Sequence, residues 1–322
     1  MSDLDRVLVL AGGLSPERDV SLRSGHLLAQ ALRDIGVDVE VRDVDSGLLS
    51  WLEVDQPDVI FPVVHGVSSE DGTLHEVLKM TEIPYVGPDP QAARLAFDKP
   101  VAKSLLDRAG LRTPASVTLP RQAFHDLGAA ALSTRLVRML PLPLCVKPRA
   151  GGSAFGVTCV RDAAELPAAL MACFGYHDDA LVEQWIDGVE IAVGVVDIAG
   201  HTTALPAVEI VPDSGFYDYT ARYTAGVTEF FCPARISEDA AAQAAAAALT
   251  AHRTLGLRDL SRTDIIVSAA GESYVLETNV SPGLTETSTF PIGLRTAGHD
   301  LGLVCRDLAA TAAARGPRTP AT

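Results

Sequence analysis

The order of apolar and polar positions near the start of the chain predicts a strand, a helix and two more strands. A continuous apolar run, RVLVLAG at 6–12, is typical of a buried parallel strand that turns into a loop. A helix is predicted at 21–36, where leucine and alanine recur at helical spacing after Ser21. Apolar runs at 37–41 and 59–64 predict two strands. This βαβ beginning predicts a parallel sheet with its ligands at the carboxyl ends of the strands.

The remaining pattern predicts two further units. Prolines at 84, 88 and 90 mark a boundary before a helix at 99–110. A Gly-rich loop, PRAGGSAFG at 148–156, lies between two short strands in the manner of a hairpin. The other expected elements are strands at 144–147, 157–160, 180–184, 191–196, 205–211, 263–267 and 274–277, helices at 163–174 and 237–256, and a disordered tail after Ala314.

Length and composition fit a protein with several compact units. A chain of 322 residues is longer than a domain with a single hydrophobic core usually is, so two or three units around a shared cleft are expected. Hydrophobic residues form 48% of the chain, yet no apolar run approaches the roughly 20 residues of a membrane span. The start, MSDLDRVLVLAGG, reads as a first strand and not as a secretion signal, so a cytoplasmic location is expected.

The excess of acidic over basic residues limits the kinds of molecule that the protein is expected to bind. The formal charge of -15, without a run of Lys or Arg, argues against a nucleic-acid partner. The five cysteines are scattered without metal-ligand spacing, which indicates buried reduced thiols. An acidic protein that handles a polyphosphate must therefore supply a few placed cations and a bound Mg²⁺.

Oxygen-bearing side chains in two predicted strands form the most specific constellation. Asp264 lies in one strand, and Glu277 and Asn279 lie at the end of the next. Glu277 and Asn279 share a face because side chains alternate, and Asp264 on a neighbouring strand can share it. Two carboxylates and an amide suit Mg²⁺ on nucleotide phosphates, whereas Zn²⁺ prefers His or Cys. Spacing alone equally allows ordinary solvated residues at strand ends.

Two lysines and the Gly-rich loop predict phosphate contacts. Lys147 ends an apolar strand, and Lys99 begins a helix. The loop at 151–156 lacks the GxxxxGK(S/T) order of a P-loop, so its backbone N–H groups would act as a mobile flap. A plain turn beside solvated lysines is the alternative interpretation.

Loops after the first and third predicted strands carry candidate substrate ligands. Gly12 and Gly13 do not continue as GxGxxG, so a dinucleotide-binding dehydrogenase is rejected. Glu17 could hold a substrate ammonium, although a solvated glutamate near a helix N-terminus is the commoner case. His65 follows the third strand, where a single histidine is more often structural than catalytic.

Eight motifs, in this order, resemble the D-alanine:D-alanine ligase family of the ATP-grasp superfamily. They span 7–308 and read AGGLSPERDVSLRSG, HGVSSEDGTL, DKPVAK, VKPRAGGSAFGV, LVEQWIDGVE, FYDYTARY, RTDIIV and LETNVSPGLTETS. The resemblance implies an α/β, three-domain ATP-grasp fold with an N-terminal Rossmann-like (preATP-grasp) domain. The implied units are 1–95, a central subdomain 96–189 with the flap, a C-terminal subdomain 190–314 with the metal site and a covering loop, and a disordered tail 315–322.

The resemblance also assigns roles to individual residues. Lys99 and Lys147 would contact ATP phosphates, Glu183, Gln184, Trp185 and Ile186 would form the adenine hinge, and Glu190 would bind the ribose. Asp264, Glu277 and Asn279 match ligands of Mg²⁺ or Mn²⁺. Glu17 matches the ligand of the first amino acid's ammonium, His65 lies near its carboxylate, and Ser153 and Tyr223 join Glu17 in a network that closes the site. Arg262 and the N–H of Gly283 would stabilise the tetrahedral intermediate, and Arg222, Ser288 and Thr289 would surround phosphates or the second substrate's carboxylate.

The activity that the resemblance implies is ATP-dependent joining of two D-alanines through an acyl phosphate, for peptidoglycan synthesis. A homodimer through the N-terminal unit is expected as well. Ser69, Gly151, Ala154, Gln184 and Arg222 depart from the family pattern, which leaves room for a related ATP-grasp ligase that joins a different small amino acid. A nucleotide-binding regulatory protein without turnover would need a broken metal site or a missing Arg262, and both are intact.

Overall fold

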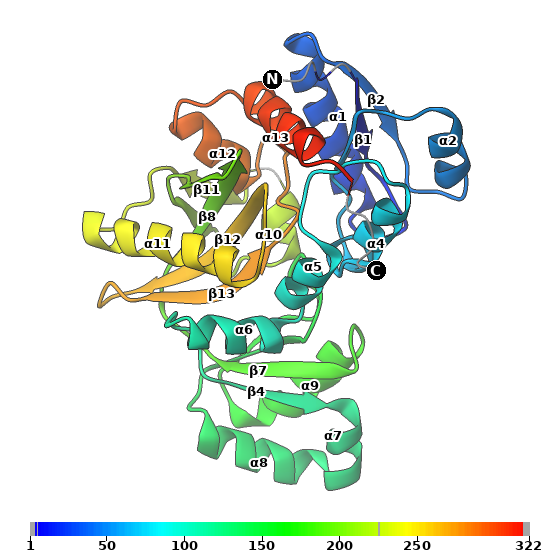
Figure 1. The fold of residues 1–322 in the computed structure, drawn as a ribbon. Helices are drawn as coiled ribbons and strands as arrows, with labels where there is room; N and C mark the ends of the chain where they lie inside the picture. Colours follow the sequence, from blue (N-terminus) through cyan, green and yellow to red (C-terminus); the bar gives the residue numbers. More distant parts are fainter. Residues whose placement is uncertain (1–3, 5, 225, 318–322) are drawn as a thin grey trace.

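The N-terminal unit is a small parallel sheet with its helices. The structure, a computed structural model, describes residues 4, 6–224 and 226–317. Strand β1 (Arg6–Leu10), whose residues 7–10 are fully buried, pairs in parallel with β2 (Asp38–Arg42) and β3 (Val59–Pro62), which confirms the predicted parallel beginning. The helices of this unit are α1 (Arg18–Asp34), α2 (Leu48–Val54), α3 (Val67–Glu70) and α4 (Thr73–Met80) (Figure 1).

Helix α1 begins at Arg18 and not at the predicted Ser21. Ser21 does not cap the helix, because its hydroxyl donates to the carbonyl of Val63 and accepts from the N–H of Gly12, both at 2.8 Å. It therefore ties the helix to the ends of β1 and β3. The cap position is Glu17, which brings this carboxylate to the carboxyl end of the sheet, where α/β folds bind their ligands.

The central unit is a four-stranded sheet in the order β4-β7-β5-β6. Strands β5 and β6 pair antiparallel, as the predicted hairpin requires. The predicted helix at 163–174 is split, because Pro167 lies in the first turn of the α-helical part. The elements are β4 (Ser116–Pro120), α7 (Arg121–Leu127), α8 (Ala129–Met139), β5 (Leu144–Pro148), β6 (Thr158–Val160), the 3-10 helix η1 (Ala163–Glu165), α9 (Leu166–Phe174) and β7 (Asp179–Gln184).

The third unit is a six-stranded sheet in the order β11-β10-β8-β12-β13, with β9 paired to β8. The predicted strand at 205–211 begins only at Val208, after Pro206, which has no N–H to give to a ladder. The elements are β8 (Gly188–Ile198), β9 (His201–Ala204), β10 (Val208–Pro212), α10 (Tyr219–Tyr223), β11 (Thr228–Phe231), α11 (Glu238–Thr254), β12 (Leu260–Ser268), β13 (Ser273–Asn279), α12 (Thr289–Thr296) and α13 (Leu301–Arg315).

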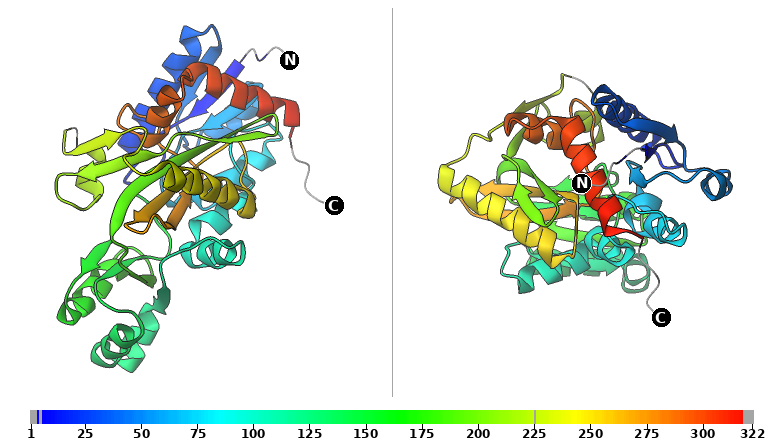
Figure 2. Two further views of the ribbon diagram at one scale, coloured as in Figure 1. Left: turned by 90° about the vertical axis from the view of Figure 1, so that its left-hand side faces the viewer. Right: turned by 45° about the horizontal axis from the view of Figure 1, so that its top comes forward.

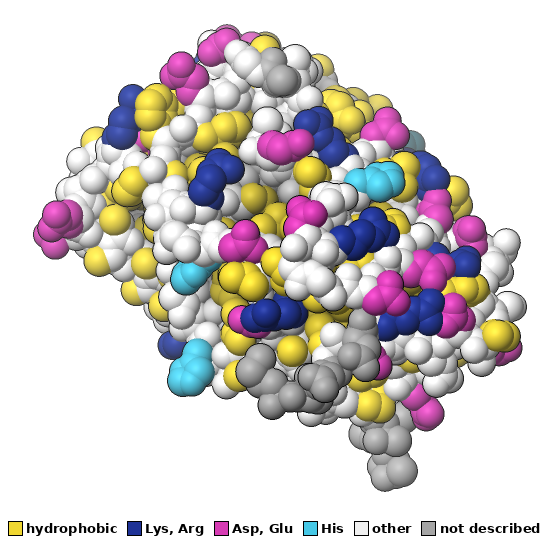
Figure 3. Space-filling model, turned by 90° about the horizontal axis from the view of Figure 1, so that it is seen from above, with side chains coloured by type: hydrophobic (Ala, Val, Ile, Leu, Met, Phe, Trp, Pro, Cys, Tyr) yellow, Lys and Arg dark blue, Asp and Glu magenta, His cyan; other side chains and the backbone are white. Residues whose placement is uncertain are grey.

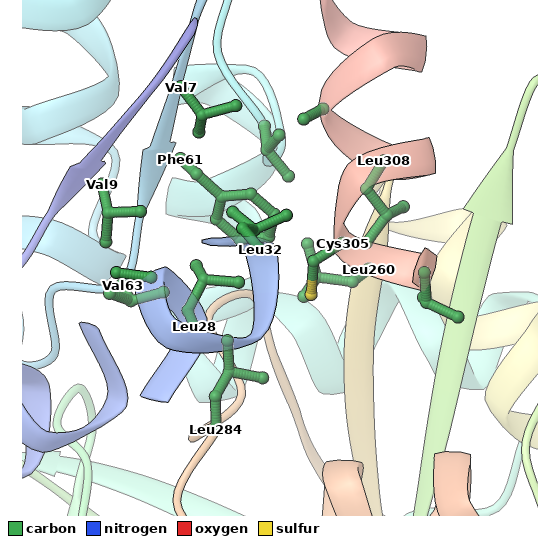
Figure 4. Packing of buried hydrophobic residues seen from close by; sticks show 14 of the residues in the cluster. Val7, Val9, Leu28, Leu32, Phe61, Val63, Leu260, Leu284, Cys305 and Leu308 are labelled. Carbon is green, nitrogen blue, oxygen red and sulfur yellow. The ribbon is translucent and has the colours of Figure 1, made fainter. Parts of the chain in front are cut away.

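Hydrophobic packing joins segments that are distant in the sequence. Val7 and Phe61 of the parallel sheet share one core with Leu260 of β12 and Leu308 of α13 (Figure 4). Helices α5 (Pro90–Phe97) and α6 (Lys99–Arg108) pack on the third sheet, where Leu106 shares a core with the strands and α11. The packing therefore crosses the predicted limit between 95 and 96, while the division into three units stays a prediction.

The end of the described chain is ordered by an ion pair. Arg315, expected at the start of a disordered tail, is the last residue of α13. That expectation is wrong for Arg315, because its guanidinium donates to both carboxylate oxygens of buried Asp259, at 2.9 and 2.8 Å. Positions 318–322 of the predicted tail lie outside the described residues.

The shape of the molecule and the charges on its surface are consistent with several compact units and with a sequence that has no basic run. The central unit lies at one end of the molecule and the N-terminal unit at the other (Figure 2). On the face drawn in Figure 3, basic side chains are interspersed with acidic ones. Among the described helices, none has the length and apolar character that crossing a membrane requires. All five cysteines are free thiols, as predicted, but the expectation that they are buried holds only for Cys173 and Cys305, because the other three are partly exposed.

Candidate active site

Two adjoining cavities lie between the units. The larger, of about 570 Å³, is lined by β5, the Gly-rich flap, the link from β7 to β8, β10, and the neighbouring strands β12 and β13. The smaller, of about 70 Å³, is lined by the loops after β1 and β3, the flap tip, α10 and the segment after β13. Arg222, Asp264 and Glu277 line both cavities, so the two spaces meet at these charged groups.

The residues predicted to hold the nucleotide lie together. All eight line the larger cavity: Lys99, Lys147, Glu183, Gln184, Trp185, Ile186, Glu190 and Arg222. Burial raises the pKa of Glu190 to about 7, against the opposing effect of Arg222. The volume is within the range of small-molecule sites. Nucleotide binding by these side chains remains a prediction.

Helix α6 positions Lys99 beside the flap. Its first turn is capped by Asp98, whose carboxylate accepts from the N–H of Val101 and pairs with the guanidinium of Arg149 at 2.6 Å. Lys99 at the helix start donates to the carbonyl of Gly151 at 2.7 Å and lies 3.1 Å from a carboxylate oxygen of Glu277. One ammonium therefore links helix, flap and β13.

The predicted metal ligands share one face of the third sheet. Asp264 and Glu277 are paired across β12 and β13, two positions along from the pair of Arg262 and Asn279 and therefore on the same face. Asp264 accepts from both Nε and Nη2 of Arg262, at 2.7 and 2.8 Å, and from the amide of Asn279 at 3.1 Å. Burial alone would raise the pKa of Glu277, but Lys99, with other cations, lowers it to about 2. Glu277 is therefore ionised, and both carboxylates are paired with cationic side chains.

This set of oxygens fits a hard divalent cation. Asp264, Glu277 and Asn279 all line the smaller cavity, and the two carboxylates also line the larger one. Carboxylate and amide oxygens are ligand types that Mg²⁺ prefers. In the part of the chain that the structure describes, no cluster of three or more His, Cys, Asp or Glu side chains could hold a metal. The predicted set contains only two such residues, so the remaining ligands would come from the amide, water and phosphate.

The network predicted to close the smaller cavity is present. The hydroxyl of Ser153, on the flap, bonds to the carboxylate of Glu17 and lies 2.6 Å from the hydroxyl of Tyr223 on α10. Burial raises the pKa of Glu17, an effect that the Ser153 bond opposes, and burial raises the pKa of Tyr223 to about 12. Ser153 has a φ of 51°, so the flap adopts a strained turn to make this contact.

His65 faces a neighbouring acid that the sequence interpretation did not single out. Burial lowers the pKa of His65 to about 4, with Arg262 adding to the effect, so the ring is neutral. Glu70, the last residue of α3, is also buried and lies 3.9 Å from His65 Nδ1. Burial, helped by the charge of Glu17, raises the pKa of Glu70 to about 8. The only sequence signal for Glu70 was its place in a loop at the sheet's carboxyl edge.

The remaining predicted residues also reach the smaller cavity, which Gly283, Ser288 and Thr289 line. A Cβ at Gly283 would lie 2.8 Å from the hydroxyl oxygen of Ser288, so the close approach of that hydroxyl requires glycine. The side chain of Tyr217, which was not predicted, lies under the guanidinium of Arg222 at 4.3 Å and lines both cavities.

A second unpredicted residue is Lys103, one turn after Lys99 on α6. Its ammonium pairs with the carboxylate of Glu183, and Lys147 pairs with the other oxygen of that carboxylate at 2.6 Å. Both lysines and Glu183 are buried. The motif DKPVAK contains Lys103, but sequence spacing could not show that its partner comes from β7.

Solved structures share this architecture over nearly the whole chain. VanG D-Ala:D-Ser ligase from Enterococcus faecalis superimposes with a TM-score of 0.82 at 29% identity, over 95% of this chain and 99% of that one. The D-alanine–D-alanine ligase from Bacillus anthracis complexed with ATP gives 0.80 at 26% identity, over 98% of each chain. The fold and the paired cavities define an ATP-grasp ligase.

Sequence comparison identifies the family. Models of the D-ala D-ala ligase N-terminus and C-terminus match residues 49–88 and 105–308. D-alanine–D-alanine ligase from Anaeromyxobacter dehalogenans (strain 2CP-C) is 41% identical over 286 residues, 89% of this chain and 90% of the relative. The chain belongs to the D-alanine–D-alanine ligase family.

Proposed function

We propose that this protein joins two D-alanine molecules at the expense of ATP and releases ADP and phosphate. The observation that carries the proposal is the pair of cavities that meet at Asp264 and Glu277, one lined by lysines and the other by unmatched carboxylates. The first suits a nucleotide triphosphate, and the second suits the ammonium of an amino acid. The relatives named D-alanine–D-alanine ligase support this substrate over a different small amino acid.

Chemistry begins at the boundary between the cavities. The carboxylate of the first D-alanine attacks the γ-phosphorus of ATP, which forms an acyl phosphate and releases ADP. Glu17 holds the ammonium of this amino acid, while Lys99 and Lys147 meet the phosphates. A bound Mg²⁺ would supply charge neutralisation on the transferred phosphoryl group, held by Asp264, Glu277 and Asn279.

The second step forms the peptide bond. The free amine of the second D-alanine attacks the acyl carbon, and phosphate leaves with the carbonyl–phosphate oxygen. The guanidinium of Arg262 and the N–H of Gly283 stabilise the negative oxygen of the tetrahedral intermediate. Because water would hydrolyse the acyl phosphate, the flap and α10 must cover the site, and the bond between Ser153 and Tyr223 holds them together.

Substrate identity is tested by product analysis. The protein is incubated with ATP, Mg²⁺ and D-alanine, L-alanine, D-serine or D-lactate, alone and in pairs, and phosphate release is followed with mass spectrometry of the products. The proposal expects D-alanyl-D-alanine as the main product. A mixed dipeptide formed in preference from D-alanine and D-serine would instead make this a ligase of the alternative kind, and phosphate release without any dipeptide would contradict both.

Three further features belong to the same proposal: the Mg²⁺ requirement, a cytoplasmic location and a homodimer formed through the N-terminal unit. Supply of the dipeptide for peptidoglycan calls for a cytoplasmic enzyme, because ATP is abundant there. A homodimer rests on the family resemblance and on the frequency of twofold dimers. Light scattering after gel filtration measures the mass, and a monomer at micromolar concentration would contradict the dimer.

A further inference from the structure

Three buried charged side chains, Glu183, Lys103 and Lys147, lie together at the wall of the larger cavity. The carboxylate of Glu183, 2% exposed, has one oxygen paired with Lys103 and the other with Lys147. Burial alone would raise the pKa of Glu183, but Lys147 and Lys103 together lower it, so the carboxylate is ionised. The group therefore carries two cations against one anion.

The two lysines differ in what they can reach. Lys147 lines the cavity together with Glu183, whereas Lys103 is not among the described residues that line it. Lys103 also donates to the carbonyl of Pro114 at 2.7 Å, which anchors its ammonium away from the cavity. Only Lys147 can turn toward a ligand without giving up a backbone contact.

A phosphate that attracts Lys147 away from Glu183 would remove one of the two cations that neutralise this carboxylate. A buried carboxylate left without a cation is costly, because nothing replaces its lost hydration. With Lys103 fixed on the opposite oxygen, Glu183 keeps a partner when Lys147 leaves. The distribution of lysines supports this exchange. Only four of the 26 basic residues are lysines, and three of them, Lys99, Lys103 and Lys147, lie in or directly beside the larger cavity. A compact ammonium on a flexible stem suits such an exchange better than a planar guanidinium.

We propose that Lys103 is a positioning residue that compensates Glu183, so that Lys147 is free to move from Glu183 to the phosphates of a bound nucleotide. The inference rests on the proposed function, since it assumes that Lys147 meets a nucleotide. Lys103 itself does not touch the ligand. Its removal therefore affects nucleotide binding through Glu183 alone.

A double-mutant cycle on nucleotide affinity tests this role. Calorimetric titration with a non-hydrolysable ATP analogue and Mg²⁺ measures the Kd of the wild type, K103M, E183Q and K103M/E183Q. K103M is expected to raise the Kd by at least about tenfold, since Lys147 is then held as the only counter-ion of Glu183. In the E183Q background, K103M should change the Kd by less than about threefold, because no carboxylate remains to be compensated.

Controls separate the role from a loss of fold. K79M, the matched change at a lysine that does not line the cavity, should leave the Kd unchanged, and the KM of K103M for D-alanine should stay within about twofold of the wild type. If K103M does not fold, K103Q keeps a hydrogen-bond donor for Pro114 and removes only the charge, and the same cycle applies.

Two outcomes overturn the inference: wild-type affinity in K103M, or equal weakening by K103M in the Glu183 and E183Q backgrounds. The second would show that Lys103 acts through the fold of α6. Failure of the proposed function gives a different result, namely no binding of the analogue, or no dipeptide, by the wild type itself.

Discussion

The two cavities treat buried carboxylates in opposite ways. Around the larger cavity, the side chains of Glu183 and Glu277 are 2% and 23% exposed, yet the lysines near them outweigh burial and lower the pKa of each. In the smaller cavity, Glu17 and Glu70 are also buried, but burial prevails and the pKa of each is raised. Burial acts to raise the pKa of all four carboxylates, so the difference lies in the cations that each receives.

This difference matches the two kinds of ligand. A lysine that is paired with an acid can move to a polyphosphate without leaving that carboxylate unpaired, because Glu183 and Glu277 each have more than one cation nearby. Acids without a matched cation instead gain most from the ammonium of an amino acid. The comparison predicts that changing an acid in one cavity affects one substrate, while changing an acid at the boundary stops the reaction.

The largest effect is expected at the boundary, with Glu277→Gln. The change removes a charge from the predicted cation site and from Lys99 while keeping the volume. Phosphate release at saturating ATP and D-alanine should fall at least about a hundredfold, because charge neutralisation on the moving phosphoryl group is lost. Circular dichroism should show an unchanged fold. Near-normal turnover at high Mg²⁺ would remove Glu277 from the cation site.

A smaller and selective effect is expected from Glu17→Gln. Glutamine can still bond to Ser153 but cannot balance an ammonium, and a hydrogen bond to a charged group contributes about 1.5–3 kcal/mol. The KM for D-alanine should therefore rise about 10- to 100-fold, with the KM for ATP nearly unchanged. Lys147→Ala is the matched control and should give the reverse pattern. Equal effects on both substrates in either variant would erase the distinction between the cavities.

Tyr223→Phe should act on closure more than on binding. The variant keeps the ring and loses the 2.6 Å bond to Ser153, which joins α10 to the flap. Turnover should fall by about tenfold, the equivalent of one hydrogen bond in a charged network. With D-alanine and D-lactate together, the wild type should form only the dipeptide and the variant some ester. Mass spectrometry decides, and ester from the wild type would show that Tyr223 does not select the amine.

The sequence predicts several parts of the fold that have a buried face, although it missed others, such as α13 with its buried Cys305 and Leu308. β1 and β8 carry long apolar runs, and the helix α11 has a stripe of buried alanines, so their patterns indicate strand or helix. Helix α7 has no buried residue, and both ends of β4 are exposed. Their core-facing side chains, such as Leu119 and Phe124, are only partly buried, so the periodic pattern is weak and both elements went unpredicted.

The residues of the candidate site also differ in how far the sequence could predict them. Residues with a motif around them, such as Lys147 and Asp264, could be predicted by resemblance. Lys103 and Glu70 also lie in motifs, DKPVAK and HGVSSEDGTL, but they received no role, because their roles depend on partners brought close only by folding. The bidentate pair of Arg262 and Asp264 was unexpected for the same reason, since the family resemblance assigns Arg262 to the tetrahedral intermediate and Asp264 to the cation.

The smallest effect is expected from Glu70→Gln, and it appears in stability. The pKa of Glu70 is raised from 4.5 to about 8, so the folded protein holds a proton that the unfolded chain loses above about pH 4.5. Its contribution to stability is full below that pH and is lost as the pH rises through about 8. Glutamine does not titrate, so the wild type's free energy of unfolding should drop by about 1–3 kcal/mol relative to the variant between pH 5 and 8.5. Urea denaturation at both pH values measures it, and Glu53→Gln at an exposed position is the control. A parallel pH dependence in wild type and Glu70→Gln would show that Glu70 is ionised, and the contrast between the two cavities would then rest on Glu17 alone.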